Sequence, residues 1–186
     1  MRIVAGTYRG LALAALGKGD AGAHLRPTTD RVRESLFNVL AGGKFGDALT
    51  DARTLDLFAG TGALGLEALS RDGECATFVD DGRKAQNLIE QNIAICKAGS
   101  KCKLIRADAT RLPRNPDAPY DLVFLDPPYA KAMGEKAIAA ALTGNWLTAR
   151  ALVVWEDSAP ITVPDALTLL DTRKYGDTKI NFLEPK

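Results

Sequence analysis

The residues with the clearest chemical potential stand at positions 126–129, where the sequence reads Asp-Pro-Pro-Tyr. The apolar residues before them, Val123 to Leu125, are typical of the end of a buried strand. Each proline fixes φ and favours extended geometry in its predecessor, so Asp126 and Tyr129 are predicted to project from a stiff corner. A carboxylate, free carbonyls and an aromatic ring could hold a planar base and accept hydrogen bonds from its exocyclic amine. A simple strand end with a Pro-Pro turn is the alternative, and four residues alone do not decide between the two.

A glycine-rich turn is the second feature that could do chemistry. A short apolar strand at 54–58 runs into Ala59-Gly60-Thr61-Gly62, and a helical pattern follows. Glycine lets a backbone approach a ligand closely, and the amino terminus of a helix offers free N–H groups. The Lys-Ser/Thr pair of a Walker loop and the full GxGxxG of dinucleotide folds are both missing. The turn therefore indicates either a different ligand site or only a strand-to-helix connection.

Acidic residues follow several of the predicted strands. Asp80 ends a strand about 20 residues after the glycine turn, the spacing at which an acid binds ribose hydroxyls in nucleotide-binding α/β folds. Asp108 follows the next strand, and Asp126 follows the one after that. The carboxyl ends of parallel strands meet at one edge, so these acids and the turn after Asp56 predict a ligand crevice along that edge.

The elements that must position these residues alternate between strand and helix, which predicts an α/β fold with a Rossmann-like, doubly wound sheet. An amphipathic helix is predicted after Asp30, with its arginines outside the apolar stripe. The last two strands are joined by a short turn at 175–177 and must pair antiparallel. The predicted strands are 54–58, 76–80, 102–105, 120–125, 151–156, 166–170 and 180–183, and further helices are predicted after the glycine turn, at 85–96 and at 137–142.

The length of 186 residues suits one domain with a small appendage. We expect a basic N-terminal arm, formed by a small hairpin and a mobile loop, at residues 1–25 and the main domain at 26–186. Residues 1–44 contain seven Lys and Arg against three Asp and Glu, a net charge of +4, whereas the whole chain carries +1. This asymmetry indicates a polyanion partner, with a solvated arm as the alternative. The arginines considered for RNA contact are Arg2, Arg9, Arg26, Arg31 and Arg33.

Composition excludes several classes of protein. No apolar run approaches the roughly 20 residues needed to cross a bilayer, and the first residues lack the core of a signal peptide, so a cytoplasmic location is expected. Cys75, Cys96 and Cys102 show no CxxC spacing, which favours reduced thiols over disulfides or a zinc site. The single histidine, His24, leaves no His-rich metal site.

The ordered motifs resemble those of class I S-adenosylmethionine-dependent methyltransferases that modify exocyclic amines. More narrowly, LRPTTDRVRESLFN, LDLFAGTGALGLEALSR and VFLDPPY are similar to segments of the bacterial RsmD family, which methylates the guanine-966 N2 amine of 16S ribosomal RNA. The resemblance covers nearly the whole chain. It implies a seven-stranded class I methyltransferase sheet with an antiparallel last strand, and a monomer. It also implies S-adenosylmethionine as cofactor, S-adenosylhomocysteine as product, and 16S ribosomal RNA within a small-subunit assembly particle as partner.

The resemblance also assigns roles to residues. It places Asp56, Ala59, Gly60, Thr61 and Gly62 around the methionine part of the cofactor, Asp80 on the ribose hydroxyls, and Asp108 and Ala109 beside the adenine. It assigns contact with the target base to Asp126, Pro127, Pro128 and Tyr129. Our hypothesis is that Asp126 and the Pro127 carbonyl orient the amine while Tyr129 stacks on a flipped-out base. Asp126 is expected to be ionised unless it is buried.

Two other kinds of function compete with this one. The Asp-Pro-Pro-Tyr motif also occurs in DNA adenine-N6 methyltransferases and, as a close variant, in protein glutamine methyltransferases. Those enzymes usually carry a target-recognition domain or other extension, for which this chain has no room. A nucleotide- or RNA-binding module without catalysis is the alternative from another class, and the intact set of strand-end acids argues against it.

Overall fold

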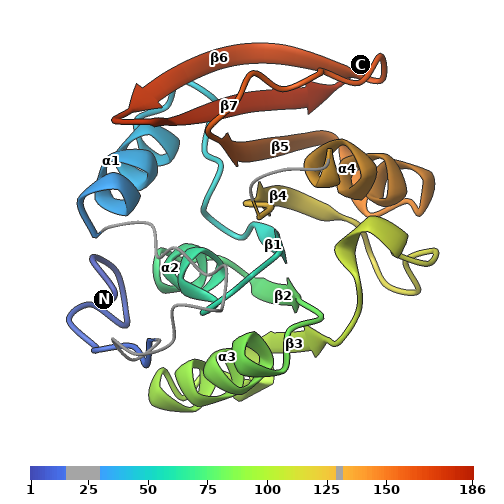
Figure 1. Ribbon diagram of the computed structural model, residues 1–186. Coiled ribbons are helices and arrows are strands. Elements are labelled where there is room, and N and C mark those ends of the chain that lie inside the picture. The colour runs from blue at the N-terminus through green and yellow to red at the C-terminus, as the bar shows by residue number, and fades with distance from the viewer. Residues whose placement is uncertain (16–29, 129–131) are drawn as a thin grey trace.

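A central sheet of seven strands organises the protein, in the order β3-β2-β1-β4-β5-β7-β6 (Figure 1). The computed structural model describes residues 1–15, 30–128 and 132–186. Strands β1 to β5 form a parallel block, and β7 runs antiparallel between β5 and β6. The predicted doubly wound sheet is thus confirmed. The strands are β1 (Arg53–Leu57), β2 (Cys75–Val79), β3 (Cys102–Ile105), β4 (Tyr120–Leu125), β5 (Leu147–Asp157), β6 (Leu167–Tyr175) and β7 (Thr178–Pro185).

Helices cover both faces of the sheet. In Figure 1, α1, α2 and α3 lie on one side of the strands, and α4 lies on the other side with the short 3₁₀ turn η2. A second 3₁₀ turn, η1 (Gly99–Lys101), precedes β3. The helices are α1 (Asp30–Ala41), α2 (Ala63–Ser70), α3 (Arg83–Ile95) and α4 (Met133–Thr143), and η2 is Ala109–Arg111.

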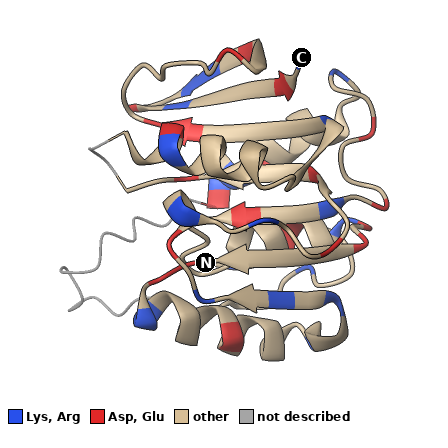
Figure 2. Ribbon diagram, turned by 90° about the vertical axis from the view of Figure 1, so that its right-hand side faces the viewer, with Lys and Arg blue, Asp and Glu red and all other residues tan. Residues whose placement is uncertain are grey.

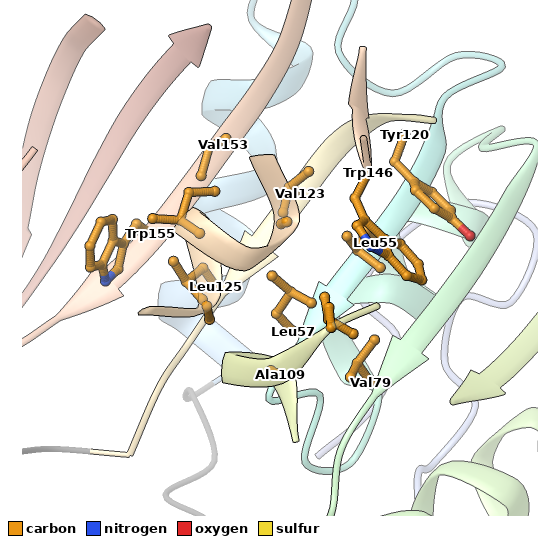
Figure 3. Close-up of a cluster of buried hydrophobic side chains, with 14 of the residues drawn as sticks. Leu55, Leu57, Val79, Ala109, Tyr120, Val123, Leu125, Trp146, Val153 and Trp155 are labelled. Carbon is orange, nitrogen blue, oxygen red and sulfur yellow. The ribbon is translucent and has the colours of Figure 1, made fainter. Parts of the chain in front are cut away.

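Alternation along β4 divides the core between the two faces. Leu122 and Phe124 are buried in the cluster that contains the apolar residues of α1. Val123 and Leu125 point to the opposite side, into the cluster that contains Trp155 and the apolar residues of α4 (Figure 3). Successive strand residues face opposite sides of a sheet, so a fully apolar strand is what two covered faces require.

Two elements, β5 and α4, begin four residues earlier than predicted. Strand β5 begins at Leu147, which pairs with Tyr120 before the register shifts. The exposed residues 149 and 150 interrupt the apolar pattern there, so the sequence signal is clear only from residue 151. Helix α4 begins at Met133, because its first turn packs through Gly134, a residue without an apolar side chain to mark it.

The N-terminal residues form the predicted hairpin. The Ile3 N–H donates to the Leu11 carbonyl at 3.0 Å, and the Leu13 N–H donates to the Met1 carbonyl at 3.1 Å. Ile3 and Leu13 are buried against apolar residues of α2 and α3. We call residues 1–15 the arm. Most of the predicted mobile loop, and the predicted domain boundary after residue 25, lie outside the described residues.

A buried carboxylate on α2 holds the arm. Glu67 accepts hydrogen bonds from the N–H groups of Val4 at 2.8 Å and Ala5 at 3.0 Å. Its charge is balanced by Arg71, at 2.9 Å, and by Arg33 of α1, at 3.6 Å. Arg33 is only 1% exposed, so the prediction that the α1 arginines lie outside the apolar stripe is wrong for this residue. A buried carboxylate needs such compensation, and the sequence of α1 alone does not reveal it.

Close packing at the start of α4 gives a first prediction. A Cβ on Gly134 would lie 2.3 Å from Cζ2 of the fully buried Trp155. We expect Gly134→Ala to lower the free energy of unfolding by about 1–3 kcal/mol, because helix and indole must separate. Urea denaturation measures this. Gly99→Ala is the control, since a Cβ there meets nothing within 4 Å, and its change should stay within about 0.5 kcal/mol. Equal stability of both variants would contradict this packing.

Candidate functional site

The ends of the central strands meet at one edge of the sheet. Leu57 of β1 pairs with Val79 of β2 and with Leu125 of β4, and Val79 pairs with Ile105 of β3. The segments that follow these residues therefore leave the sheet side by side. Strand β1 lies between β2 and β4, where the chain order reverses, and such switch points hold ligands in open α/β sheets. The predicted convergence is confirmed for the glycine turn, Asp80, Asp108 and Asp126.

The glycine turn has the backbone that its sequence predicts. Gly60 and Gly62 have φ values of +59° and +74°, which side chains with a Cβ rarely adopt. The Ala59 N–H donates to the Val79 carbonyl at 3.1 Å, and the Gly62 N–H donates to the Ala59 carbonyl at 2.7 Å. A Cβ on Gly62 would lie 3.2 Å from the Phe78 ring. The turn is thus folded tightly over β2 and leads directly into α2.

Asp80 fixes the glycine turn to the neighbouring turn. One carboxylate oxygen accepts from the Gly60 N–H at 2.9 Å, and the other accepts from the Gly82 N–H at 2.9 Å. Burial raises the pKa of this carboxyl, and the two hydrogen bonds oppose that rise. Each oxygen of a carboxylate has a further lone pair, so Asp80 can still accept hydrogen bonds from ligand hydroxyls.

Asp56 lies beneath the turn. It is 2% exposed, and its carboxylate accepts from the Gly65 N–H of α2 at 3.0 Å. Burial raises the pKa of Asp56 to about 8, and the neighbouring Asp80 adds to the rise. Gly65 is required here, because a Cβ would lie 2.5 Å from the Phe78 ring. Asp56 therefore supports the first turn of α2 from inside the protein.

Asp108 differs from the other strand-end acids. Its Oδ1 accepts from the Thr110 N–H at 2.8 Å and from the Thr110 hydroxyl at 2.7 Å. These bonds, with Arg111 and Lys136 nearby, hold the pKa of Asp108 below its usual range. The carboxylate caps η2, and the adjacent Ala109 is buried.

Asp126 begins the corner after β4, and its N–H donates to the Leu57 carbonyl at 3.4 Å. Burial raises the pKa of Asp126 well above its usual range, and Glu156, Asp56 and Asp157 raise it further. Asp126 and Pro128 are half-buried, and Pro127 is buried. The expected ionisation of Asp126 is conditional on exposure, and its raised pKa works against ionisation. Tyr129 lies outside the described residues.

Sequence reasoning missed the acids at the end of β5. Glu156 and Asp157 follow Trp155, which pairs with Leu125, so they lie beside the Asp126 corner. Their position could have been predicted, because these acids end a parallel strand and Asp80 directly follows one.

Sequence reasoning also missed Asn92 of α3. Its side chain is fully buried and donates to the Thr61 carbonyl at 2.8 Å and to the Ala14 carbonyl at 3.1 Å. Its oxygen accepts from the Ala14 N–H at 2.7 Å. Asn92 therefore joins the glycine turn to the arm. The only signal in the sequence is an amide side chain close to the apolar face of a predicted helix.

The predicted RNA-contacting arginines are not equivalent. Arg2, Arg9 and Arg31 are exposed, whereas Arg33 is buried against Glu67 and Asp30 and donates to the Arg2 carbonyl. Arg33 is thus placed to hold the arm. Arg26 lies outside the described residues.

Residues 1–15, 30–128 and 132–186 contain no group of three or more His, Cys, Asp or Glu residues that could hold a metal ion. The same residues form no helix that is long and apolar enough to span a membrane.

Comparison with known proteins identifies the family. The family model described as "Conserved hypothetical protein 95" matches residues 1–184. The protein named ribosomal RNA small subunit methyltransferase D from Escherichia coli (strain K12) is 37% identical over 164 residues, which cover 88% of this chain and 78% of the relative. The chain belongs to this family of RsmD methyltransferases. The RsmD protein of Haemophilus influenzae is 36% identical over 182 residues, covering 95% of this chain and 89% of the relative.

A solved structure agrees with the RsmD assignment. The putative methyltransferase yhhF from Escherichia coli superposes with a TM-score of 0.82 at 35% identity, covering 100% of this chain and 98% of the other. The match includes the arm and the final hairpin as well as the sheet. That solved structure therefore shares the architecture described above over nearly its whole length.

The raised pKa of Asp56 gives a second prediction. Its carboxyl has a pKa of about 8 in the folded protein against an ordinary value of 3.8, so the folded state keeps a proton that the unfolded state loses. Stability from this group is complete at low pH and is lost as pH rises through this window, by about 1.4 kcal/mol per pH unit. Asp56→Asn should therefore show a shallower loss of unfolding free energy between pH 5 and pH 7. Urea denaturation at both pH values measures this, and parallel profiles would show that Asp56 is ionised when folded.

Proposed function

We propose that this protein transfers a methyl group from S-adenosylmethionine to the exocyclic N2 amine of a guanine in 16S ribosomal RNA. The names of the relatives support ribosomal RNA of the small subunit as the substrate class. One observation carries the chemical part. A glycine turn braced by Asp80 and the corner formed by Asp126, Pro127 and Pro128 leave the sheet from adjoining strands.

The residues at this edge fit the cofactor. Bound S-adenosylmethionine would supply an electrophilic methyl group on a positively charged sulfonium. Carboxyls whose pKa is raised by burial, such as those of Asp56 and Asp80, are stabilised as anions by a cationic ligand. Asp80 has lone pairs for ribose hydroxyls, and Asp108, which follows the neighbouring strand β3 with Ala109 packed in the core behind it, would lie beside the adenine.

The chain's own contribution to catalysis is alignment. A sulfonium needs no strongly activated nucleophile, so the rate depends on holding the amine nitrogen in line with the methyl group and on stabilising charge as it develops. Ionised Asp126 can accept hydrogen bonds from the amine, and the rigid Pro127 carbonyl can accept another. Tyr129 keeps its predicted role of stacking on the extruded base, an interaction typically worth about 1–3 kcal/mol.

The exposed arginines support contact with RNA phosphates. Arg2 and Arg9 lie on the arm, and Arg31 lies on α1. Glu67 links the arm to α1, because it accepts a hydrogen bond from the arm backbone and forms a salt bridge with Arg33. Such contacts position an RNA without reading its sequence. A small-subunit assembly particle as substrate and a monomeric enzyme remain part of the proposal.

Methyl transfer from labelled cofactor tests the proposed function. The acceptors are methyl-free small-subunit RNA, particles assembled from it, and duplex DNA. Digestion to nucleosides should place the label in N2-methylguanosine. Label in DNA adenine would favour the DNA enzyme, and no transfer to any acceptor would favour a binding module without catalysis.

Asp126 provides a third prediction. Asp126→Asn keeps the shape of the side chain but removes its charge, and should lower kcat by about 10²–10³-fold, as loss of one charge-stabilising group does in other enzymes. Cofactor affinity, measured by calorimetry, should change little. Asp177→Asn in the exposed β6–β7 turn is the control and should match the wild type. A comparable loss of cofactor affinity in Asp126→Asn would instead indicate a structural role.

The pH dependence of transfer gives a fourth prediction. Because burial and neighbouring acids raise the pKa of Asp126, this carboxyl keeps its proton to a higher pH than an ordinary Asp does. The rate should therefore rise with pH, with an apparent pKa above the ordinary Asp value of about 4. The rise should be absent from the residual activity of Asp126→Asn. A profile of the same shape in both proteins would exclude Asp126 as the titrating group.

A further inference from the structure

A groove of about 830 Å³ lies between η2 and α4. Figure 2 faces this side of the molecule, which is opposite to the face covered by α1, α2 and α3. Among the residues that the structure describes, its lining includes three cations, Arg111, Arg114 and Lys136, and no acidic residue. A groove whose charged side chains are all cationic favours an anionic ligand.

Two of these three cations are free to pair with a ligand anion. The third, Arg111, forms a salt bridge with Asp108, with 3.7 Å between Nε and Oδ2. Arg114 and Lys136 are exposed, and within the part of the chain that the structure describes they take part in no salt bridge. Lys136 is nevertheless close enough to lower the pKa of Asp108. The groove therefore combines an excess of positive charge with proximity to the proposed cofactor site.

The neutral residues of the lining suit the sugar-phosphate backbone of a nucleic acid rather than its bases. Hydroxyl and amide side chains provide neutral hydrogen-bond donors, and small residues leave room for close approach. These are Thr110, Thr143 and Asn145, with Ala139, Ala140 and Gly144. None of the described residues that line the groove is aromatic, so the lining as described offers no stacking surface.

The position of the groove relates it to the Asp126 corner. One end is beside Thr110 and Lys136, in the segments that directly follow Asp108 and the corner, and the other end reaches Asn145 beyond α4. The arm, with Arg2 and Arg9, lies on the opposite face of the sheet. A nucleotide chain that places one base at the corner must leave it in two directions, and exposed cations lie on both faces of the sheet, in the groove and on the arm.

We propose that this groove binds phosphates of the RNA strand that flanks the target guanine, on the side away from the arm. The inference rests on the proposed function. Arg114 and Lys136 supply the charge, and the neutral donors hold sugar and phosphate oxygens. Contacts of this kind fix the register of an RNA without specifying its sequence.

The test is a double variant, Arg114→Gln with Lys136→Gln, compared in RNA binding by fluorescence anisotropy over a series of salt concentrations. The probe is a methyl-free fragment of small-subunit RNA. Loss of two phosphate contacts should weaken binding about 10-fold at low salt and reduce the slope of log affinity against log salt by about 1.4. In methyl transfer, KM should rise while kcat at saturating RNA stays within about twofold.

The matched control is Lys97→Gln with Lys101→Gln. These exposed lysines lie just after α3 and in η1, outside the lining of the groove, and their replacement removes the same charge. An equal effect of the two double variants on affinity and slope would overturn the proposal, because only the net charge of the protein would then decide RNA affinity. So would a groove variant that loses cofactor affinity but binds RNA like the wild type. Binding is read without catalysis, so a wild type that binds RNA but transfers no methyl group would refute only the proposed function.

Discussion

Three carboxyl groups that are buried or half-buried share the edge on which the site is built. Burial raises the pKa of Asp56, Asp80 and Asp126, and each feels the charge of at least one other acid. Crowded acids of this kind are stabilised where donors reach them, and here the backbone donates to Asp80 through Gly60 and Gly82 and to Asp56 through Gly65. The position of the glycine turn, the start of α2 and the start of α3 all follow from that requirement. The same requirement explains why the edge suits a positively charged ligand.

Hydrogen bonds connect the arm to the elements that carry the site. Glu67 connects the arm to the second turn of α2, and Asn92 connects it to the carbonyl of Thr61 in the glycine turn. Each of these side chains is fully buried, so its hydrogen bonds cannot be exchanged for bonds to water without exposing the core. A change in the arm is therefore transmitted to the turn through hydrogen bonds and not only through shape.

The sequence allowed the sheet and its edge to be predicted because both depend on local patterns. Alternation of strand and helix, the glycines at 60 and 62, and the acids at strand ends are visible without long-range information. Arg33 and Asn92 could not be predicted in the same way. Each sits on an amphipathic helix where a polar residue normally faces solvent, and each is buried because of a partner distant in the sequence. Glu156 and Asp157 were predictable in principle, since β5 is a parallel strand that ends in acids.

The arm's contacts also set an order of events during synthesis. Val4 and Ala5 bond to a residue more than 60 positions later, and Ala14 bonds to one 78 positions later. Val4, Ala5 and Ala14 therefore have no docking surface until α2 and α3 have been synthesised. Contacts of such sequence separation form late because the intervening chain must be ordered first. The arm accordingly docks only after α2 and α3 have formed, and a chain that ends before them exposes Ile3 and Leu13, which the folded protein buries.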